Sequence, residues 1–260
     1  MTRTEMCARL PAAELEFAAF NAARTTPVAR DDAIRRGATA TFDFLLDGTR
    51  PQSTYYNRAI ARSVAPFGAD ALDELPREVA AVELRPAQLD PALSGRLLEL
   101  GFKPAYQLCY LGGIPSELAR ASSDAGLNVE RLDADHADLF FDLLQLEGVD
   151  FPVEKRAMKR AFYCNDRFRA YVARRVDGTA CAWTTMFAGA ESGFLGNSFT
   201  LPQFRRSGAH SALLAARFAD AARLGLAVVF TDVEHGSQSH QNCERAGLRT
   251  LTINTIWSRV

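Results

Sequence analysis

The chain has 260 residues, of which 48% are hydrophobic and 23% are charged, a composition that is ordinary for a globular protein. Its length suits one large domain or two small ones. With 30 basic and 31 acidic side chains, the formal net charge is −1. The chain as a whole therefore has no attraction for nucleic acid or an anionic membrane, and any phosphate site must be local.

The cysteines and the N-terminus indicate the compartment. The cysteine count is odd, and no pair has the spacing of metal ligands: Cys7, Cys109, Cys164, Cys181 and Cys243. We therefore expect a reduced, cytoplasmic protein without a disulfide framework or a metal site. We expect no signal peptide in the first ten residues, and no apolar run of the sequence approaches the ~18 residues that span a bilayer.

The first 113 residues alternate helical and extended patterns. Helices are expected at 11–24, 70–75 and 91–100. The last of these has an Asp90-Pro91 start and ends at Gly101. Strands are expected at 54–63, 80–84 and 106–111, whereas 39–46 fits either a strand or a short helix.

A stretch rich in proline, serine and glycine, 114–127, is expected to be a linker. A second set of elements follows it. Helices are expected at 134–147, 153–163, 211–224 and 239–246. Strands are expected at 128–132, 168–174, 179–187, 193–200, 227–233 and 250–258.

The two halves match at an offset of 146 residues, from Ala81 to Ala227. In both, a short apolar strand leads to a helix, a glycine ends the helix, and a second strand follows. Gly101 and Gly247 are the two helix-ending glycines. One interpretation is a duplicated fold, and the other is chance, because this order is common in α/β proteins.

The strongest signal is 201–210, Leu-Pro-Gln-Phe-Arg-Arg-Ser-Gly-Ala-His, which follows a strand and opens a long helix. The first N–H groups of a helix have no internal partner, and the helix dipole adds positive charge there. Arg205 and Arg206 add full charges. The stretch therefore predicts a pyrophosphate site, and the alternative is a surface loop with solvated arginines. The first half has no such loop at 61–74.

In this context the sequence resembles the GNAT superfamily of acyl-CoA N-acetyltransferases, whose fourth strand is followed by an Arg/Gln-x-x-Gly-x-Gly/Ala loop. Pro202, Arg205 and Gly208 fit this pattern, as do the helix start 212–214 and Gly247-Leu248. The resemblance covers 128–260 well and the first half faintly. It implies a mixed, mostly antiparallel sheet flanked by helices, present twice. The expected order is a degenerate copy at 1–113, the linker 114–127 and a catalytic domain at 128–260.

The resemblance further implies that the pyrophosphate belongs to coenzyme A, with the end of the preceding strand binding the pantetheine arm. The residues that it assigns to the coenzyme are Ser198, Phe199, Thr200, Leu201, Arg205, Arg206, Ser207, Gly208, Ala209, His210, Ser211 and Asn242. The implied reaction moves an acetyl group from acetyl-CoA to a primary amine, expected to be a small molecule. The amine attacks directly, so no enzyme nucleophile or metal is required.

Two positions depart from the family pattern. His210 stands where glycine or alanine is usual, and it would either bind a phosphate oxygen or point to solvent. Cys243 stands where many members have a tyrosine that protonates the leaving thiolate. A cysteine with an ordinary pKa of about 8.5 can serve as such a donor. Alternatively, the thiol is packed and inert, and solvent or the Ser239 hydroxyl donates.

The sequence leaves four candidates for the general base that deprotonates the amine: Glu234, His235, Glu147 and a water ordered by Asn197 and Ser198. Glu234, Cys243 and Ser239 are the candidate catalytic side chains. In the first half, residues 55–57 are candidates for one wall of the acceptor pocket.

Two other functions fit the same residues. One is transfer from a longer acyl-CoA, and the other is a regulatory domain that binds CoA without turnover. The missing tyrosine and the unassigned base favour the second. A dinucleotide-binding fold is disfavoured, because no Gly-x-Gly-x-x-Gly run follows an early strand. We expect a monomer or a homodimer.

Overall fold

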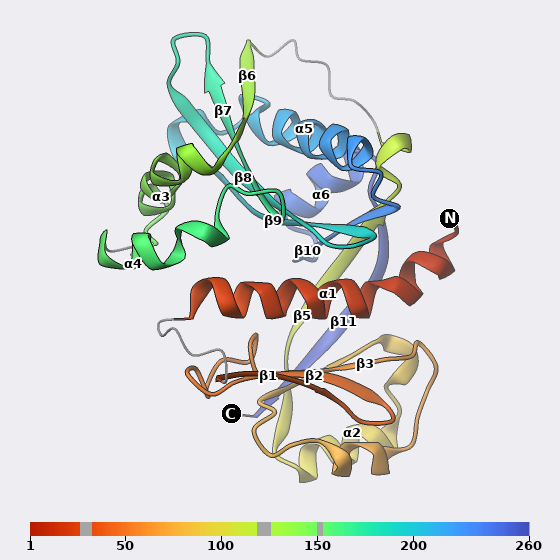
Figure 1. Ribbon diagram of the computed structural model, residues 1–260. Helices are drawn as coiled ribbons and strands as arrows, with labels where there is room; N and C mark the ends of the chain where they lie inside the picture. The colour runs from red at the N-terminus through yellow and green to blue at the C-terminus, as the bar shows by residue number, and fades with distance from the viewer. Residues whose placement is uncertain (27–32, 119–125, 150–152, 260) are drawn as a thin grey trace. The chain divides into compact units, whose positions relative to one another are not determined.

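The computed structural model describes residues 1–26, 33–118, 126–149 and 153–259 (Figure 1). The chain divides into two compact units. Unit 1 comprises Met1–Leu111, Val233–Ser237 and Thr250–Val260, and unit 2 comprises Gly112–Asp232 and Gln238–Arg249. Half of the expected linker, residues 119–125, lies outside the described residues.

The described residues of unit 1 form a long α-helix, a short α-helix and six strands. The helices are α1 (Arg3–Thr25) and α2 (Pro91–Glu99). The strands are β1 (Ile34–Ala38), β2 (Phe42–Asp47), β3 (Arg58–Ala61), β4 (Ala81–Leu84), β5 (Phe102–Gly113) and β11 (Arg249–Arg259). They lie in the order β1-β2-β3-β4-β11-β5. The pairs β1–β2, β2–β3 and β4–β11 are antiparallel, whereas β3 and β4 are parallel.

Helix α1 begins about two turns before Pro11, where the sequence pattern placed its start. A capping box explains the earlier start, because Glu5 N donates to Thr2 Oγ1 at 3.2 Å and Thr2 N donates to Glu5 Oε2 at 2.6 Å. Pro11 lies inside the helix and has no N–H for the carbonyl of Cys7. Arg85 Nη2 donates to that carbonyl at 3.3 Å instead, so a side chain replaces the missing helical bond.

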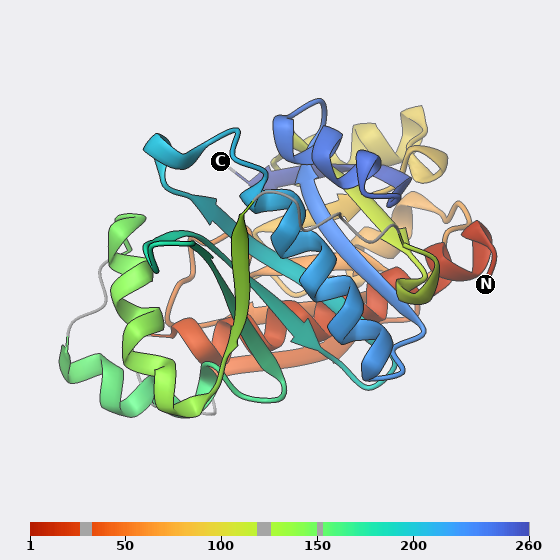
Figure 2. The same ribbon diagram turned by 90° about the horizontal axis from the view of Figure 1, so that it is seen from above.

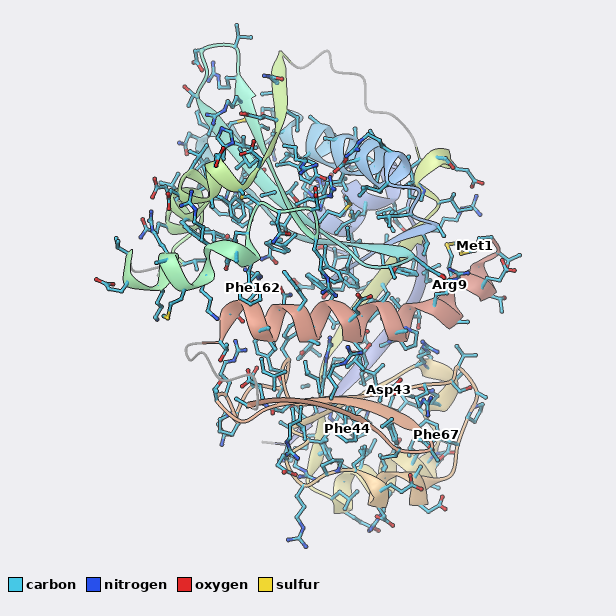
Figure 3. The ribbon with its side chains drawn as sticks, viewed as in Figure 1. Met1, Arg9, Asp43, Phe44, Phe67 and Phe162 are labelled. Atoms are coloured by element: carbon cyan, nitrogen blue, oxygen red, sulfur yellow. The ribbon has the colours of Figure 1, made fainter. Side chains whose placement is uncertain are left out.

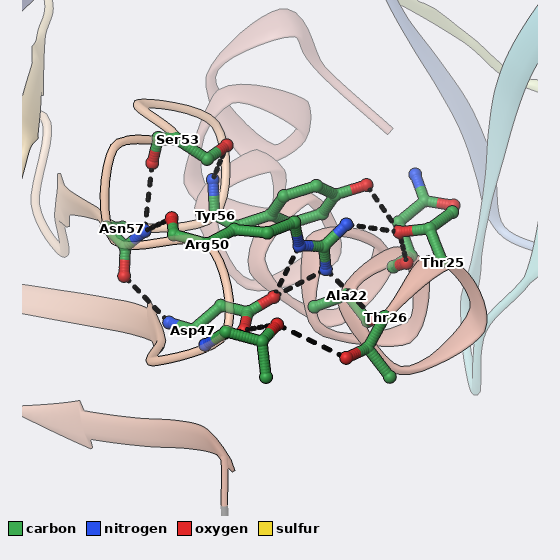
Figure 4. A network of polar contacts seen from close by, with 10 residues as sticks. Ala22, Thr25, Thr26, Asp47, Arg50, Ser53, Tyr56 and Asn57 are labelled. Atoms are coloured by element: carbon green, nitrogen blue, oxygen red, sulfur yellow. Dashed lines mark hydrogen bonds and ion pairs between the residues drawn. The ribbon is translucent and has the colours of Figure 1, made fainter. Parts of the chain in front are cut away.

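The connection between β2 and β3 is held by buried polar groups (Figure 4). The carboxylate of Asp47, which is fully buried, accepts from Thr49 N at 2.9 Å, Thr49 Oγ1 at 2.6 Å and Arg50 Nε at 2.7 Å. Arg50 Nη1 also donates to Thr25 Oγ1 at 2.7 Å, at the end of α1. Asn57 accepts from Asp47 N at 2.7 Å and donates to the Arg50 carbonyl at 2.7 Å. The side chain of Asn57 is thus occupied inside unit 1.

Leu15, Ala18 and Ala22 of α1 form one core cluster of unit 1 with Leu45 and Ile60 of the sheet. A second core cluster lies between the sheet and helix α2. Phe42 and Phe67 meet edge to face with their ring centroids 5.1 Å apart. Phe44 packs on the same cluster, and Figure 3 labels it together with Phe67. A Cβ at Gly37, opposite Phe44 in the β1–β2 pair, would come within 2.3 Å of the Phe44 ring, so the ring requires a glycine there. Trp257 of β11 belongs to this cluster, which makes the last strand part of the unit 1 core.

In the part of unit 2 that the structure describes there are four α-helices and five strands. The last two residues of strand β10 belong to unit 1. The helices are α3 (Ala137–Leu146), α4 (Val153–Lys159), α5 (Ala209–Arg223) and α6 (Gln238–Arg245). The strands are β6 (Leu127–Leu132), β7 (Phe168–Arg175), β8 (Ala180–Ala188), β9 (Ser192–Thr200) and β10 (Val228–Glu234). Their order is β10-β9-β8-β7-β6, and only the β9–β10 pair is parallel among the pairs of this unit. Helix α5 lies across the sheet (Figure 2).

The repeat seen in the sequence holds for the secondary structure. At the offset of 146 residues, β4, α2 and β5 correspond to β10, α6 and β11. Each unit also has one parallel pair, β3–β4 or β9–β10, whose strands are joined by a crossover. In unit 2 the crossover carries α5, whereas in unit 1 residues 62–80 carry a 3₁₀ helix, Ala69–Glu74, and no α-helix. The first copy of the crossover therefore has no helix N-terminus of the kind that binds phosphate.

The expected fold class, a mixed and mostly antiparallel sheet flanked by helices, is confirmed. Some boundaries differ from the sequence pattern. The expected strand 54–63 is shortened to β3 by the polar loop before it, the helix expected at 70–75 is 3₁₀, and the helix expected at 153–163 changes to 3₁₀ after Lys159. In the part of the chain that the structure describes, no helix is both long and apolar enough to cross a bilayer.

Candidate functional site

Strand β9 changes its pairing on both edges near its middle. Against β8, Thr185 faces Gly196 but Thr184 faces Ser198, so Asn197 is an extra residue and forms a β-bulge. Against β10, the parallel register runs from Ser192 only to Phe194. Beyond Phe194 the backbone of β9 is therefore not paired with the backbone of β10. The Leu195 carbonyl accepts from Thr231 Oγ1 at 2.9 Å, so the backbone polar groups of that edge become available to a ligand only beyond Leu195.

The loop after β9 turns its backbone amides toward one place. A 3₁₀ helix, Pro202–Phe204, is followed by two residues with left-handed backbone, Arg206 at φ 66° and Gly208 at φ 82°. The first helical bond of α5 runs from Ala212 N to Gly208 O at 3.0 Å, so the amides of residues 209–211 have no partner within the helix. Left-handed residues next to a helix N-terminus form a concave set of N–H groups that suits a phosphate.

This loop opens into a pocket of about 650 Å³ in unit 2. The pocket is lined by Ser198, Phe199, Thr200, Phe204, Arg205, Arg206, Gly208, Ala209, His210, Ser211, Gln238, Ser239, Asn242 and Arg245. Ten of the twelve residues that the sequence assigned to the coenzyme are in this lining. Leu201 and Ser207 are not, and the Leu201 amide donates to the Cys181 carbonyl at 3.0 Å.

Helix α6 supplies one wall of the pocket. Gln238, Ser239, Asn242 and Arg245 all line it, and their spacing places them along one helix face. Arg245 Nη1 donates to Asn242 Oδ1 at 2.7 Å, which holds the guanidinium beside the pocket. The sequence identified Ser239 and Asn242 but missed Gln238 and Arg245. Extending the helical period by one turn in each direction would have found them.

His210 lines the pocket and does not simply point to solvent. Burial and, to a lesser extent, the charge of Arg217 lower the pKa of His210 to about 4. The imidazole is thus neutral at pH 7. The amide nitrogen of Asn242 lies 3.5 Å from His210 Nδ1, and an amide NH₂ only donates, which leaves the imidazole proton on Nε2.

The fold is similar to that of solved structures of GCN5-related N-acetyltransferases (GNATs). The structure of a GCN5-related N-acetyltransferase from Kribbella flavida matches with a TM-score of 0.70 and 16% identity, over 97% of this chain and 95% of that chain. The chain has the GNAT fold.

Two further structures with the GNAT fold match nearly the whole chain. A GCN5-related N-acetyltransferase from Sphaerobacter thermophilus matches with a TM-score of 0.59 and 14% identity, over 96% of this chain and 92% of that chain. A tandem GNAT protein from the clavulanic acid biosynthesis pathway matches with a TM-score of 0.54 and 12% identity, over 96% of this chain and 95% of that chain. No family model and no curated protein matches the sequence.

Of the candidate acids and bases, some line the pocket and others do not. Cys243 is 3% exposed on α6 and is not among the lining residues, whereas Ser239 is. Glu234, at the end of β10, is exposed and is also not among them. Glu147, which follows α3, lies at the surface, yet partial desolvation by its surroundings raises the pKa of its carboxylate. A raised pKa suits a carboxylate that must take a proton near neutral pH.

Proposed function

We propose that this protein transfers an acyl group from an acyl-CoA, with acetyl-CoA as the donor, to a primary amine of a small molecule. One observation carries the proposal. In a chain with the GNAT fold, the left-handed Arg206 and Gly208 direct backbone amides at the start of α5 into a pocket that continues along the unpaired end of β9.

The chemistry of the lining fits coenzyme A. The amides of residues 206–211 would hold the pyrophosphate, supported by the helix dipole and by the guanidinium groups of Arg205, Arg206 and Arg245. Neutral His210 would add a hydrogen bond from Nε2. The backbone of Ser198 to Leu201 would hold the pantetheine amides, as an added strand does at a sheet edge.

The reaction needs no enzyme nucleophile. The amine nitrogen attacks the thioester carbonyl, the C–N bond forms, the C–S bond breaks, and the amine loses a proton while the departing thiolate gains one. Backbone N–H groups at the Asn197 bulge would stabilise the oxyanion. Glu147, Glu234, His235 or an ordered water would accept the amine proton. Ser239 or solvent would protonate the thiolate, with Cys243 as the third candidate donor.

The tandem organisation belongs to the same proposal. Residues 1–113 would form a copy without a coenzyme site, because their crossover carries a 3₁₀ helix where unit 2 has α5. Residues 128–260 would form the catalytic copy, with β11 placed in the core of unit 1. We further propose that the protein acts in the cytoplasm as a monomer or a homodimer.

Binding of coenzyme A tests the site directly. Gly208→Ala places a Cβ on a left-handed residue of the phosphate loop, whereas Gly225→Ala does the same at φ 72°, beyond the far end of α5 and with no atom within 4 Å of the new Cβ. Both changes have a backbone cost of about 1 to 2 kcal/mol. Calorimetric titration with CoA should show micromolar binding by the wild type and by Gly225→Ala, and binding about tenfold weaker by Gly208→Ala. Equal affinities in the two variants would contradict the assignment.

A second candidate function is CoA binding without turnover. It is favoured by the position of Cys243, which replaces the usual tyrosine and is buried away from the pocket lining. Thiol release from acetyl-CoA in the presence of a panel of primary amines separates the two functions. Release above the amine-free rate supports the transferase, and binding without release from any amine supports the regulatory domain.

A further inference from the structure

A buried arginine lies beneath the β9 bulge. Arg217 of α5 is 2% exposed, and within the described residues no carboxylate lies within ion-pair distance of it. Burial lowers the pKa of Arg217 to about 10, so the side chain is still charged at neutral pH. A buried guanidinium that has no counter-ion opposes folding, because hydrogen bonds to carbonyls only partly replace its hydration. Stability alone therefore gives no reason for a cation at this position.

Arg217 Nε donates to the Leu213 carbonyl of its own helix at 3.4 Å, whereas the end of the guanidinium reaches the bulge. Its Nη1 donates to the Thr185 carbonyl at 3.2 Å and to the Gly196 carbonyl at 3.2 Å. Thr185 and Gly196 are the last facing pair before the register between β8 and β9 shifts. A bulge disrupts the local ladder of backbone bonds, and here a side chain binds the carbonyls on both strands at that point.

Thr184 holds the bulge from β8. Its hydroxyl lies 3.0 Å from the Asn197 carbonyl and 2.6 Å from Ser198 Oγ. Thr184 is fully buried, so the hydroxyl has no competing water. Arg217 and Thr184 together fix the carbonyls of Gly196 and Asn197, and hence the direction of the peptide groups between them. The next residue along the strand, Ser198, already lines the pocket.

We propose that Arg217 is a positioning residue for acyl transfer, which fixes the β9 bulge so that the backbone of Asn197 and Ser198 meets the reacting thioester. This inference rests on the proposed function, since it assigns a role within the same site. The arginine does not touch the coenzyme itself. It acts through the backbone and adds a fixed positive charge behind the strand where negative charge develops during the reaction.

The test compares two buried arginines of unit 2. Arg217→Met removes the charge and the donors at similar length, Arg217→Lys keeps the charge, and Arg169→Met is the matched control. Arg169 is 3% exposed on β7 and is paired with Asp220 at 2.9 Å, away from the bulge. Kinetics with acetyl-CoA and the best amine of the panel are measured at a temperature at which thermal melting shows each variant to be folded.

We expect Arg217→Met to lower kcat about 100-fold, as displacement of reacting groups by about 1 Å does, with KM for acetyl-CoA changed less than about threefold. The kcat of Arg217→Lys should be at least about tenfold higher than that of Arg217→Met, and Arg169→Met should keep the wild-type kcat. A kcat of Arg217→Met within about threefold of the wild type, or an equal loss in the control, overturns the inference.

Hydrogen exchange keeps the inference testable without turnover. The amides of residues 196–198 should exchange at least about tenfold faster in Arg217→Met and in Thr184→Val, and at the wild-type rate in Arg169→Met. Unchanged exchange in Arg217→Met overturns the inference. Failure of the proposed function is a different result, because the wild type would then neither bind CoA nor release thiol.

Discussion

Replacing His210 measures how the imidazole in the loop 201–210 affects the free energy of unfolding. Its pKa is lowered from an ordinary 6.5 to about 4, first by burial and then by the charge of Arg217. Between these values the unfolded chain binds more protons than the native state, so the free energy of unfolding rises with pH and falls on acidification. The full shift is equivalent to about 3 kcal/mol. Because the side chain is partly exposed, we expect solvent to reduce this to about 1 to 2 kcal/mol.

The assay is urea unfolding of the wild type, His210→Ala and His210→Gln at several pH values from 7 to 4.5. As the pH falls, each variant should gain about 1 to 2 kcal/mol relative to the wild type, because it has no imidazole to protonate on unfolding. All other charged groups are the same in the three proteins, so their contributions cancel in the difference. If the difference in the free energy of unfolding between variant and wild type does not change from pH 7 to 4.5, the pKa of His210 is not lowered by folding.

Coenzyme binding gives a second measurement on the same variants. At pH 7.5 the neutral imidazole can offer one hydrogen bond, so His210→Ala should weaken CoA binding by at most about tenfold. His210→Gln retains a donor and should lie between the wild type and alanine. An unchanged affinity in His210→Ala would remove the proposed bond to a phosphate oxygen.

Two further predictions concern exposed and buried charge. Arg245→Gln should weaken CoA binding about fivefold at low salt and less at 0.5 M salt, because an exposed guanidinium is screened; calorimetry with Arg249→Gln as an exposed control measures this. Asp47→Asn should lower the free energy of unfolding by about 2 to 3 kcal/mol, and equal stability in urea unfolding would contradict the role of its network. Burial alone would raise the pKa of Asp47, but hydrogen bonds from Thr49 and Arg50 outweigh burial and lower it, so its contribution is present at neutral pH and lost as pH falls below about 4.

Local sequence patterns predicted most elements of unit 2. Strands β7 and β8, the strand before residue 201 and the helix that ends at Gly247 all depend on neighbouring residues. Each lies within a few residues of its expected place. The start of α1 is also present in the sequence, as the Thr2–Glu5 capping box, although Pro11 offers a second pattern that is typical of a first helical turn. The phosphate loop was found for the same reason, since its amides come from one continuous segment.

The tertiary structure decided what depends on distant partners. Nothing in residues 249–259 indicates that β11 pairs with β4 and contributes Trp257 to the core of unit 1, because a strand pattern does not specify its neighbour. The β9 bulge arises from the register between β8 and β9, which neither strand specifies by itself. Sequence periodicity predicts the helix that carries Arg217, but it does not predict that this side chain contacts the bulge.

The pocket shows both kinds of information in one place. The loop that opens a helix at residues 205–211 is predictable from the sequence, because its glycine, its arginines and the helical periodicity after it all lie in one continuous segment. Only the folded chain decided that α6 adds Arg245 to the same pocket, that His210 is neutral there, and that Cys243 is buried outside the lining. Burial and charge at these positions depend on side chains far away in the sequence, which is the physical reason that local patterns did not predict them.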